Sequence, residues 1–267
     1  MDDRFAFGVP DDAFERAGGV PMSKREVRAV TLSYAQVSHD GLVLEVGAGT
    51  GALTADIARL CAHGRVVAIE RSPEAFALLS RNTARLAPAN VECIEGEAPD
   101  AFEALKTVLM PEMVPVADAD APPRAAARKQ PTTQTTQTLA CPRFDVAIVG
   151  GHGGRLAEIL AALPTLLAPG GRVVVNAVGL SVAMCAFEAF AAAPWAGREM
   201  VQVSISRAGL LGCDVRLTPL NPVFVVSACC SAPGMSEPDP ATPDLPTPGM
   251  SRPDQASPGP TGSKEDA

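Results

Sequence analysis

The chain has 267 residues, 47% of them hydrophobic, and a formal net charge of −8 at pH 7. A chain of this length can bury one core of about 200 residues, and the absence of lysine and arginine runs argues against a nucleic-acid partner. Seven cysteines without a C-x-x-C spacing argue against a disulfide framework and a structural zinc site. With no apolar stretch of about 18 residues and no apolar signal segment, we expect a cytoplasmic protein that does not bind a membrane.

Strand-like and helix-like patterns alternate along the chain. The expected strands are 42–46, 66–70, 91–94, 144–149, 172–176, 199–206 and 221–227. The expected helices are 23–37, 51–61, 73–86, 98–106, 154–167 and 180–192. Ser23 and Ser72 are the expected N-caps of the first and third helices, and Pro169–Gly171 is an expected turn. The alternation predicts right-handed βαβ units and a doubly wound, mostly parallel α/β sheet of seven strands, whose last two strands form an antiparallel edge hairpin.

Two segments have too little apolar surface to offset the entropy of ordering. The first, about residues 111–142, is rich in Pro, Thr and Gln, and the second, residues 228–267, is dense in Pro and Ser. We expect a disordered surface insertion and a disordered tail, with one folded domain over residues 1–227.

The strongest motif is LEVGAGTG at residues 44–51, between the first expected strand and its helix. Glycine lets a backbone turn sharply and approach a ligand closely, and open α/β sheets bind ligands at this edge. The GxGxG spacing lacks the further glycine of the dinucleotide fingerprint, so no pyrophosphate is implied. The acidic Glu45 before the glycines suits the ammonium of a methionyl group.

Two further motifs follow the second and third expected strands. Glu70 ends the second strand about 20 residues past the glycine loop, where a carboxylate can accept hydrogen bonds from both hydroxyls of a ribose. Residues 95–99, EGEAP, follow the third strand and offer small side chains that can border an adenine ring. The three loops predict a nucleoside site typical of class I methyltransferases, which act mainly by positioning donor and nucleophile and need no metal.

Several segments outside the glycine loop resemble one family, the CbiT enzymes, which are decarboxylating precorrin methyltransferases. The most specific of them are VPMSKREVRA (20–29), GGHGGRL (150–156), VVNAV (174–178) and LNPVF (220–224). The resemblance covers about residues 8–227 apart from the insertion. It implies a class I methyltransferase fold, S-adenosylmethionine as cofactor, a precorrin substrate and a homotetramer.

The resemblance also implies residue roles and a reaction. The residues that would contact S-adenosylmethionine are Ser23, Gly47, Ala48, Gly49, Thr50, Gly51, Glu70 and Ala98. The family usually has Thr where this chain has Ser23, so the hydroxyl is retained. The implied reaction is methylation of a meso carbon of a late precorrin, with or without cobalt, coupled to loss of carbon dioxide from an acetate side chain in cobalamin biosynthesis. It assigns no catalytic residue.

Candidate substrate contacts follow the fourth to sixth expected strands. The backbone at Gly151, His152 and Gly153 can approach a flat macrocycle, and His152 is either an acid–base group or an ordinary loop histidine. Asn176 either bonds the substrate or caps its strand. Arg207 either pairs with a substrate carboxylate or is a solvated charge.

Two alternatives stay open. The chain can be a class I methyltransferase that acts on tRNA or on a protein side chain, although its acidic balance counts against RNA. It can also be a module that binds S-adenosylmethionine without catalysis, since binding alone would retain the glycine loop and Glu70.

Overall fold

The computed structural model describes residues 8–109 and 143–231. The predicted disordered insertion and nearly all of the predicted tail lie outside these residues. Strand β9 continues to Cys230, so residues 228–230, which we assigned to the tail, belong to the folded domain. None of the helices in the two described ranges is both long and apolar enough to cross a bilayer.

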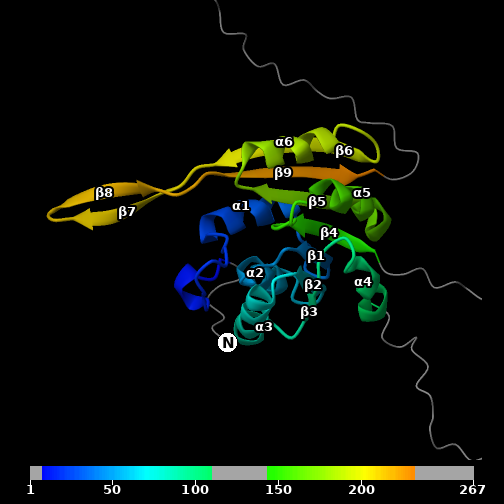
Figure 1. Cartoon of the computed structure of the whole chain (residues 1–267), viewed down its shortest axis with the longest axis horizontal. Helices are drawn as coiled ribbons and strands as arrows, with labels where there is room; N and C mark the ends of the chain where they lie inside the picture. Colours follow the sequence, from blue (N-terminus) through cyan, green and yellow to red (C-terminus); the bar gives the residue numbers. More distant parts are fainter. Residues whose placement is uncertain (1–7, 110–142, 232–267) are drawn as a thin grey trace, which may run out of the picture. The chain divides into compact units, whose positions relative to one another are not determined.

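A seven-stranded sheet in the order β3-β2-β1-β4-β5-β9-β6 organises the fold (Figure 1). Its strands are β1 (Leu42–Val46), β2 (Arg65–Glu70), β3 (Val91–Glu95), β4 (Phe144–Val149), β5 (Leu167–Ala177), β6 (Trp195–Val203) and β9 (Val223–Cys230). The pairs from β3 to β5 are parallel, and β9 runs antiparallel to both β5 and β6. The predicted doubly wound sheet is therefore confirmed, with β9 as its one reversed strand among the described residues.

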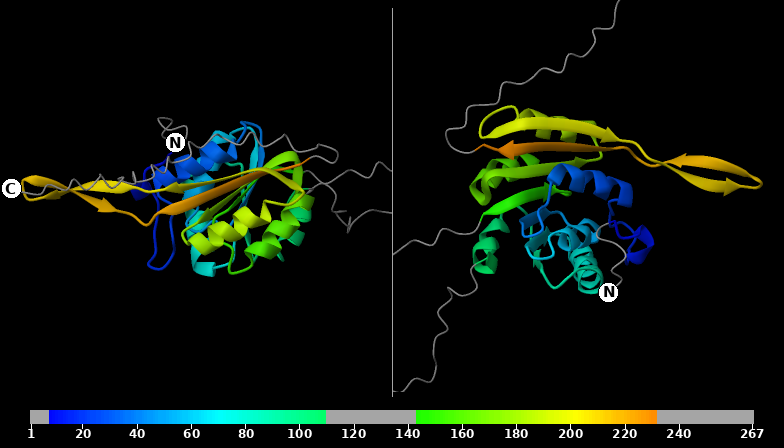
Figure 2. Two further views of the ribbon diagram at one scale, coloured as in Figure 1. Left: turned by 90° about the horizontal axis from the view of Figure 1, so that it is seen from above. Right: turned by 180° about the vertical axis from the view of Figure 1, so that it is seen from behind.

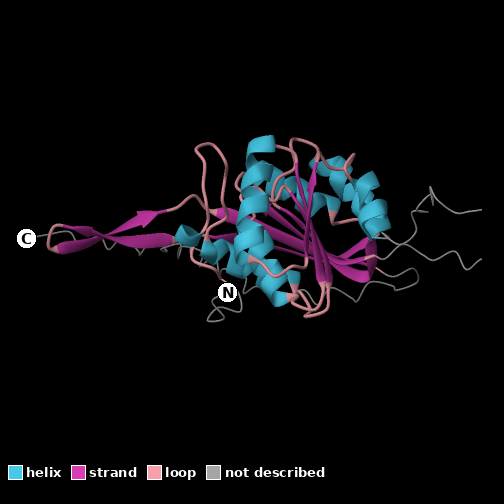
Figure 3. Ribbon diagram, turned by 90° about the horizontal axis from the view of Figure 1, so that it is seen from below, coloured by secondary structure: helices cyan, strands magenta, loops and turns pink. Residues whose placement is uncertain are grey.

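Helices cover both faces of this sheet (Figure 3). They are α1 (Arg25–Ala35), α2 (Ala52–Leu60), α3 (Pro73–Leu86), α4 (Phe102–Leu109), α5 (Leu156–Leu166) and α6 (Leu180–Ala189), with a 3-10 turn at Asp11–Ala13. One core cluster joins α1 and α2 to side chains such as Val43 and Ile148. A second joins α4, α5 and α6 to the opposite side chains, such as Leu44 and Val149. Since adjacent residues point to opposite faces, the near-continuous apolar strands serve both cores.

The structure corrects several local predictions. Ser72 caps α3 as expected, because its hydroxyl accepts a hydrogen bond from the Ala75 amide at 3.4 Å. Ser23 does not cap α1, which has Lys24 at its N-cap without a side-chain cap bond. The predicted turn at residues 169–171 lies within β5 as an irregularity in its register with β4. Helix α4 begins later than predicted, after Pro99, which disfavours helical geometry at the residue before it.

The sequence patterns missed a second, two-stranded sheet of β7 (Ser206–Leu211) and β8 (Asp214–Pro219). Every residue of the two strands is exposed, and the hairpin extends away from the main sheet (Figures 1 and 2). Its base is closed by the Leu220 amide, which donates to the Ile205 carbonyl at 2.8 Å. The other strands were predicted from the apolar residues of their buried faces. This hairpin has no buried face, so its sequence lacks that pattern.

Candidate active site

A cavity of about 400 Å³ opens at the carboxyl ends of the central strands. Four loops line it, those after β1, β2, β3 and β4, and a fifth wall comes from residues 19–23 of the N-terminal segment. This is the edge at which open α/β sheets bind ligands. The predicted motifs after the first three strands therefore converge on one cavity.

The loops after β1 and β4 touch backbone to backbone. The Val46 carbonyl accepts hydrogen bonds from the Gly150 and Gly151 amides at 2.8 and 3.2 Å. Gly47 has a φ of +73°, and a Cβ placed on it would lie 2.3 Å from the Gly151 nitrogen. Only glycine combines that backbone conformation with that approach. The glycines of these two loops therefore let the loops pack directly against each other at the ends of β1 and β4.

Glu70 holds two of the loops together. Its side chain is buried, and its Oε2 accepts a hydrogen bond from the Gly49 amide at 2.8 Å while its Oε1 accepts one from the Ser72 amide at 2.8 Å. A carboxylate has about four acceptor positions, so each oxygen retains one. Glu70 can therefore order the glycine loop and still accept the two hydroxyls of a ribose.

Glu45 is the second buried carboxyl group at the cavity. Its hydrogen-bond donor is the Thr54 hydroxyl, 2.6 Å from Oε2. The pKa of Glu45 is raised to about 8, mainly because the group is buried; the bond from Thr54 opposes this rise, and the nearby charges of Glu70 and Asp56 contribute to it. A cation at this position would favour the ionised form. Glu45 is thus suited to receive a positively charged ligand group.

The structure brings together most of the predicted site residues. Among the predicted cofactor contacts, those that line the cavity are Ser23, Glu45, Gly47, Ala48, Gly49, Thr50, Glu70 and Ala98. Gly51 lies outside this lining and is the N-cap of α2, where a Cβ would meet Leu79 at 2.9 Å. The hydroxyl of Thr50 is buried and has no hydrogen-bond partner in the described ranges, so it is available to a ligand.

The predicted substrate contacts divide into two groups. Gly151, His152 and Gly153 line the cavity, and the Nδ1 of His152 accepts a hydrogen bond from the Gly154 amide at 3.1 Å. Asn176 and Arg207 do not line the cavity.

Each of these two has a protein partner. The Oδ1 of Asn176 lies 3.0 Å from the Thr31 hydroxyl, and its Nδ2 is buried and unpaired within the described part of the chain. Arg207 donates to Glu26 at 2.6 Å and to Asp11 at 2.8 Å. Their substrate roles stay predictions.

Some lining residues were missed from the sequence. Gly19, Val20 and Pro21 form part of the N-terminal wall, and Arg71 pairs at the rim with Glu97 at 3.0 Å. The VPMSK segment was a signal for the wall, but no local pattern shows that it folds over the glycine loop. Over residues 8–109 and 143–231, no three His, Cys, Asp or Glu side chains form a group that could hold a metal ion.

Comparison with known proteins agrees with this geometry. A family model described as a precorrin methyltransferase domain matches residues 12–117. The cobalt-precorrin-6B C(15)-methyltransferase (decarboxylating) of Salmonella typhimurium is 30% identical over 219 residues, which are 82% of this chain and 94% of that protein. A protein of Pyrobaculum calidifontis with the same name, marked probable, is 30% identical over 83% of this chain and 95% of its own length.

Solved structures show the same relationship. The precorrin-6y C5,15-methyltransferase of Geobacter metallireducens superposes with a TM-score of 0.66 at 25% identity and covers 84% of this chain and 97% of its own. The precorrin 8w decarboxylase of Methanobacterium thermoautotrophicum superposes with a TM-score of 0.64 at 29% identity, covering 82% and 98%. An S-adenosylmethionine-dependent O-methyltransferase of Thermotoga maritima, 13% identical with a TM-score of 0.55, shares the fold alone and covers 80% and 68%. From its identity to these relatives over most of its length, the chain belongs to the family of decarboxylating cobalt-precorrin-6B C(15)-methyltransferases.

Proposed function

We propose that this chain methylates the C15 meso carbon of a late precorrin with S-adenosylmethionine and removes carbon dioxide from an acetate side chain of the same ring, in cobalamin biosynthesis. The observation that carries the proposal is the cavity itself. In a chain of this family, Glu70, Glu45 and the glycine loop line one space at the carboxyl edge of the sheet.

The cavity residues fit S-adenosylmethionine, whose sulfonium supplies an electrophilic methyl group. The unused acceptor positions of Glu70 suit the ribose hydroxyls, and the unpaired Thr50 hydroxyl offers a further polar contact. Glu45 would face the ammonium of the methionyl group and release its proton as that charge arrives. Ser23 and Ala98, from the N-terminal wall and the loop after β3, would enclose the nucleoside.

The tetrapyrrole would lie at the open side of the cavity. The glycine-rich backbone of Gly150, Gly151 and Gly153 lets a flat ring approach the strand ends. Arg71 at the rim is half exposed and can exchange Glu97 for a substrate carboxylate. The conjugated ring can accept the electron pair that carbon dioxide leaves behind. Methyl transfer requires the meso carbon to lie in line with the methyl–sulfur bond, so the protein's part is to orient the ring. Asn176 and Arg207 remain candidate contacts, Arg207 in exchange for its carboxylate partners.

We further propose a homotetramer, as the family resemblance implies, in the cytoplasm, as the scattered cysteines favour. The β7–β8 hairpin supports an interface between copies of the chain. Directly paired residues share one face of a hairpin, and one face here holds Ala208, Leu210, Val215 and Leu217. The side chain of Leu210 is 89% exposed. A second copy would cover this apolar face.

Incubation with methyl-labelled S-adenosylmethionine and a late precorrin tests the reaction. We expect label on the macrocycle and release of carbon dioxide, measured with the cobalt-free and the cobalt-containing substrate in parallel. Label on tRNA or protein instead would refute the substrate. Tight binding of S-adenosylmethionine with no transfer to any of these acceptors would favour a binding module.

A further inference from the structure

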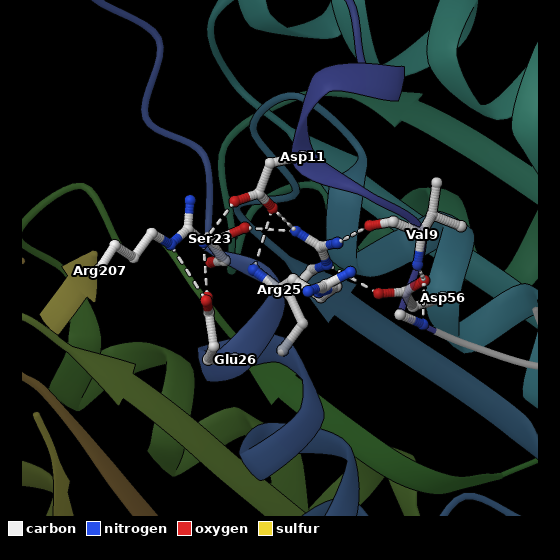
Figure 4. Close-up of polar contacts among 9 residues, drawn as sticks. Val9, Asp11, Ser23, Arg25, Glu26, Asp56 and Arg207 are labelled. Atoms are coloured by element: carbon white, nitrogen blue, oxygen red, sulfur yellow. Dashed lines mark hydrogen bonds and ion pairs between the residues drawn. The ribbon is translucent and has the colours of Figure 1, made fainter. Parts of the chain in front are cut away.

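Arg28, near the start of α1, is completely buried and donates to four acceptors, whose residues Val9, Asp11, Ser23 and Asp56 are labelled in Figure 4. Its Nε donates to Asp56 Oδ2 at 2.7 Å, and its Nη1 donates to Asp11 Oδ1 at 2.9 Å and to the Ser23 carbonyl at 2.7 Å. Its Nη2 donates to the Val9 carbonyl. A guanidinium has five N–H donors in a fixed plane, so four of them are committed in directions that a lysine could not reproduce.

Three of the four acceptors of Arg28 belong to the two ends of one segment, residues 8–23. Val9 precedes the 3-10 turn and Asp11 begins it, whereas Ser23 lies just before α1. Asp56 on α2 adds to the closure, because its Oδ1 accepts hydrogen bonds from the Gly8 and Val9 amides, both at 2.9 Å. The pair of Arg28 and Asp56 thus closes the segment into a loop fixed to α1 and α2.

The closed segment forms one wall of the cavity. Gly19, Val20, Pro21 and Ser23 line the cavity. The Pro21 carbonyl lies 3.1 Å from the position of a Cβ on Gly49, so the wall runs directly against the glycine loop.

A second anchor holds the middle of the segment. The Nδ2 of Asn82 donates to the Thr50 carbonyl at 2.8 Å and to the Glu15 carbonyl at 3.0 Å. The Glu15 amide donates back to Asn82 Oδ1 at 2.8 Å. This anchor fixes the segment at Glu15 to α3 and to the glycine loop. The stretch that ends at Ser23 is held instead by Arg28.

We propose that Arg28 is a positioning residue for the cofactor cavity, which holds residues 19–23 in the place where they enclose the methyl donor. Arg28 does not line the cavity and acts through the Ser23 and Val9 carbonyls. The inference rests on the proposed function only for the identity of the donor.

The same network reaches the exposed hairpin. Asp11 accepts Arg28 on Oδ1 and Arg207, the second residue of β7, on Oδ2. Arg207 also bonds Glu26 on α1. The N-terminal wall is therefore held by two sets of ion pairs, the buried one of Arg28 and the exposed one of Arg207 with Asp11 and Glu26.

The test compares Arg28→Gln and Arg28→Lys with the control Arg172→Lys. Arg172 also donates to the backbone of α1, to the Tyr34 carbonyl at 2.9 Å, but this carbonyl lies at the far end of the helix, and the other acceptor of Arg172 is the Cys229 sulfur rather than a group of residues 8–23. We expect Arg28→Gln to raise the dissociation constant of S-adenosylhomocysteine and the KM for S-adenosylmethionine about tenfold, with kcat at saturation within about threefold of wild type.

Two further readouts separate positioning from general stability. Amide hydrogen exchange at residues 19–23 should speed up in Arg28→Gln, and Arg28→Lys should recover part of the affinity because it keeps the charge beside Asp56. Arg172→Lys should change neither the affinity nor the exchange.

Wild-type affinity and unchanged exchange in folded Arg28 variants would overturn the proposal. If Arg28→Gln does not fold, Asp11→Asn decides, because its side chain is near the surface, 16% exposed, and it removes one charge from the network. We expect a rise of about threefold in the dissociation constant, and an unchanged value would overturn the inference. If wild type binds S-adenosylhomocysteine but does not methylate a precorrin, the proposed reaction fails while these dissociation constants still decide the role of Arg28.

Discussion

The loops after β1 and β4 and the β7–β8 hairpin leave the same edge of the sheet, but they differ in packing and in exposure to solvent. The loops after β1 and β4 are packed so closely that a Cβ on Gly47 would lie 2.3 Å from the Gly151 nitrogen. The β7–β8 hairpin follows β6, which runs in the same direction as β5. All residues of the hairpin are nevertheless exposed, and a Cβ on Gly209 would have the Arg216 carbonyl oxygen, at 4.0 Å, as its nearest neighbour apart from the adjacent residues of the chain. Packing therefore restricts residue identity in the loops, whereas the exposed apolar face of the hairpin has no such packing within the described residues.

The matched pair Gly47→Ala and Gly209→Ala tests this difference most directly. Gly47→Ala combines a backbone clash with a φ of +73°, and we expect it to lower the free energy of unfolding by about 3 kcal/mol and to abolish cofactor binding. Gly209→Ala should change it by less than about 0.5 kcal/mol. Denaturant unfolding and calorimetry measure both, and similar losses in the two variants would contradict the comparison.

A smaller effect is expected at Glu70, whose carboxylate bonds the Gly49 and Ser72 amides. Glu70→Ala leaves both amides without their acceptor and removes the proposed ribose contacts, so affinity for S-adenosylhomocysteine should fall by about 10- to 100-fold. Glu70→Gln keeps one acceptor oxygen and should lose less. The exposed Glu92, replaced by alanine, serves as control, and unchanged affinity in Glu70→Ala would remove Glu70 from the site.

The buried Glu45 predicts a pH dependence that an exposed carboxylate lacks. Its pKa is raised from the ordinary 4.5 to about 8. As the pH rises from 4.5 to 8, the unfolded chain loses this proton while the folded chain keeps it, so stability present below pH 4.5 is lost through this window. The advantage of Glu45→Gln over wild type should therefore grow by about 1 kcal/mol per pH unit.

Urea unfolding at pH 5 and pH 8, without cofactor, measures that advantage. Glu103→Gln, whose side chain is 83% exposed, should run parallel to wild type. A Glu45→Gln variant that also runs parallel would show that the carboxyl group is ionised in the folded protein.

The smallest effect on folding is expected in the hairpin. Replacing Leu210 and Leu217 by serine removes two exposed apolar side chains, so the free energy of unfolding should change by less than about 0.5 kcal/mol. If this face joins copies of the chain, sedimentation should show a lower mass for the double variant, and Arg216→Ser on the opposite face should keep the wild-type mass. An unchanged mass in the double variant would argue against the hairpin as an interface.

The contrast also explains what the sequence could predict. Buried strands such as residues 43–46 are apolar because they are packed on both faces, and the LEVGAGTG motif has glycines where its loop is tightly packed. The sheet and most cavity residues could therefore be predicted from the local sequence pattern. The hairpin has no buried face to generate such a pattern. The wall at residues 19–23 depends on Arg28 and Asp56. These residues are 28 positions apart in the sequence, and their side chains meet from two different helices. No spacing rule brings such partners together, so the wall was visible only through family resemblance.

The position of β9 has a consequence for how the chain folds during synthesis. β9 lies between β5 and β6, although it follows both in sequence. The strands β1 to β5 can pair as they leave the ribosome, but β6 has β9 as its only neighbour in the described sheet and must wait for it. Until residue 230 emerges, the outer edge of β5 and both edges of β6 present unpaired amides and carbonyls to other chains. Truncation within β9 should therefore yield aggregation rather than a smaller, functional enzyme.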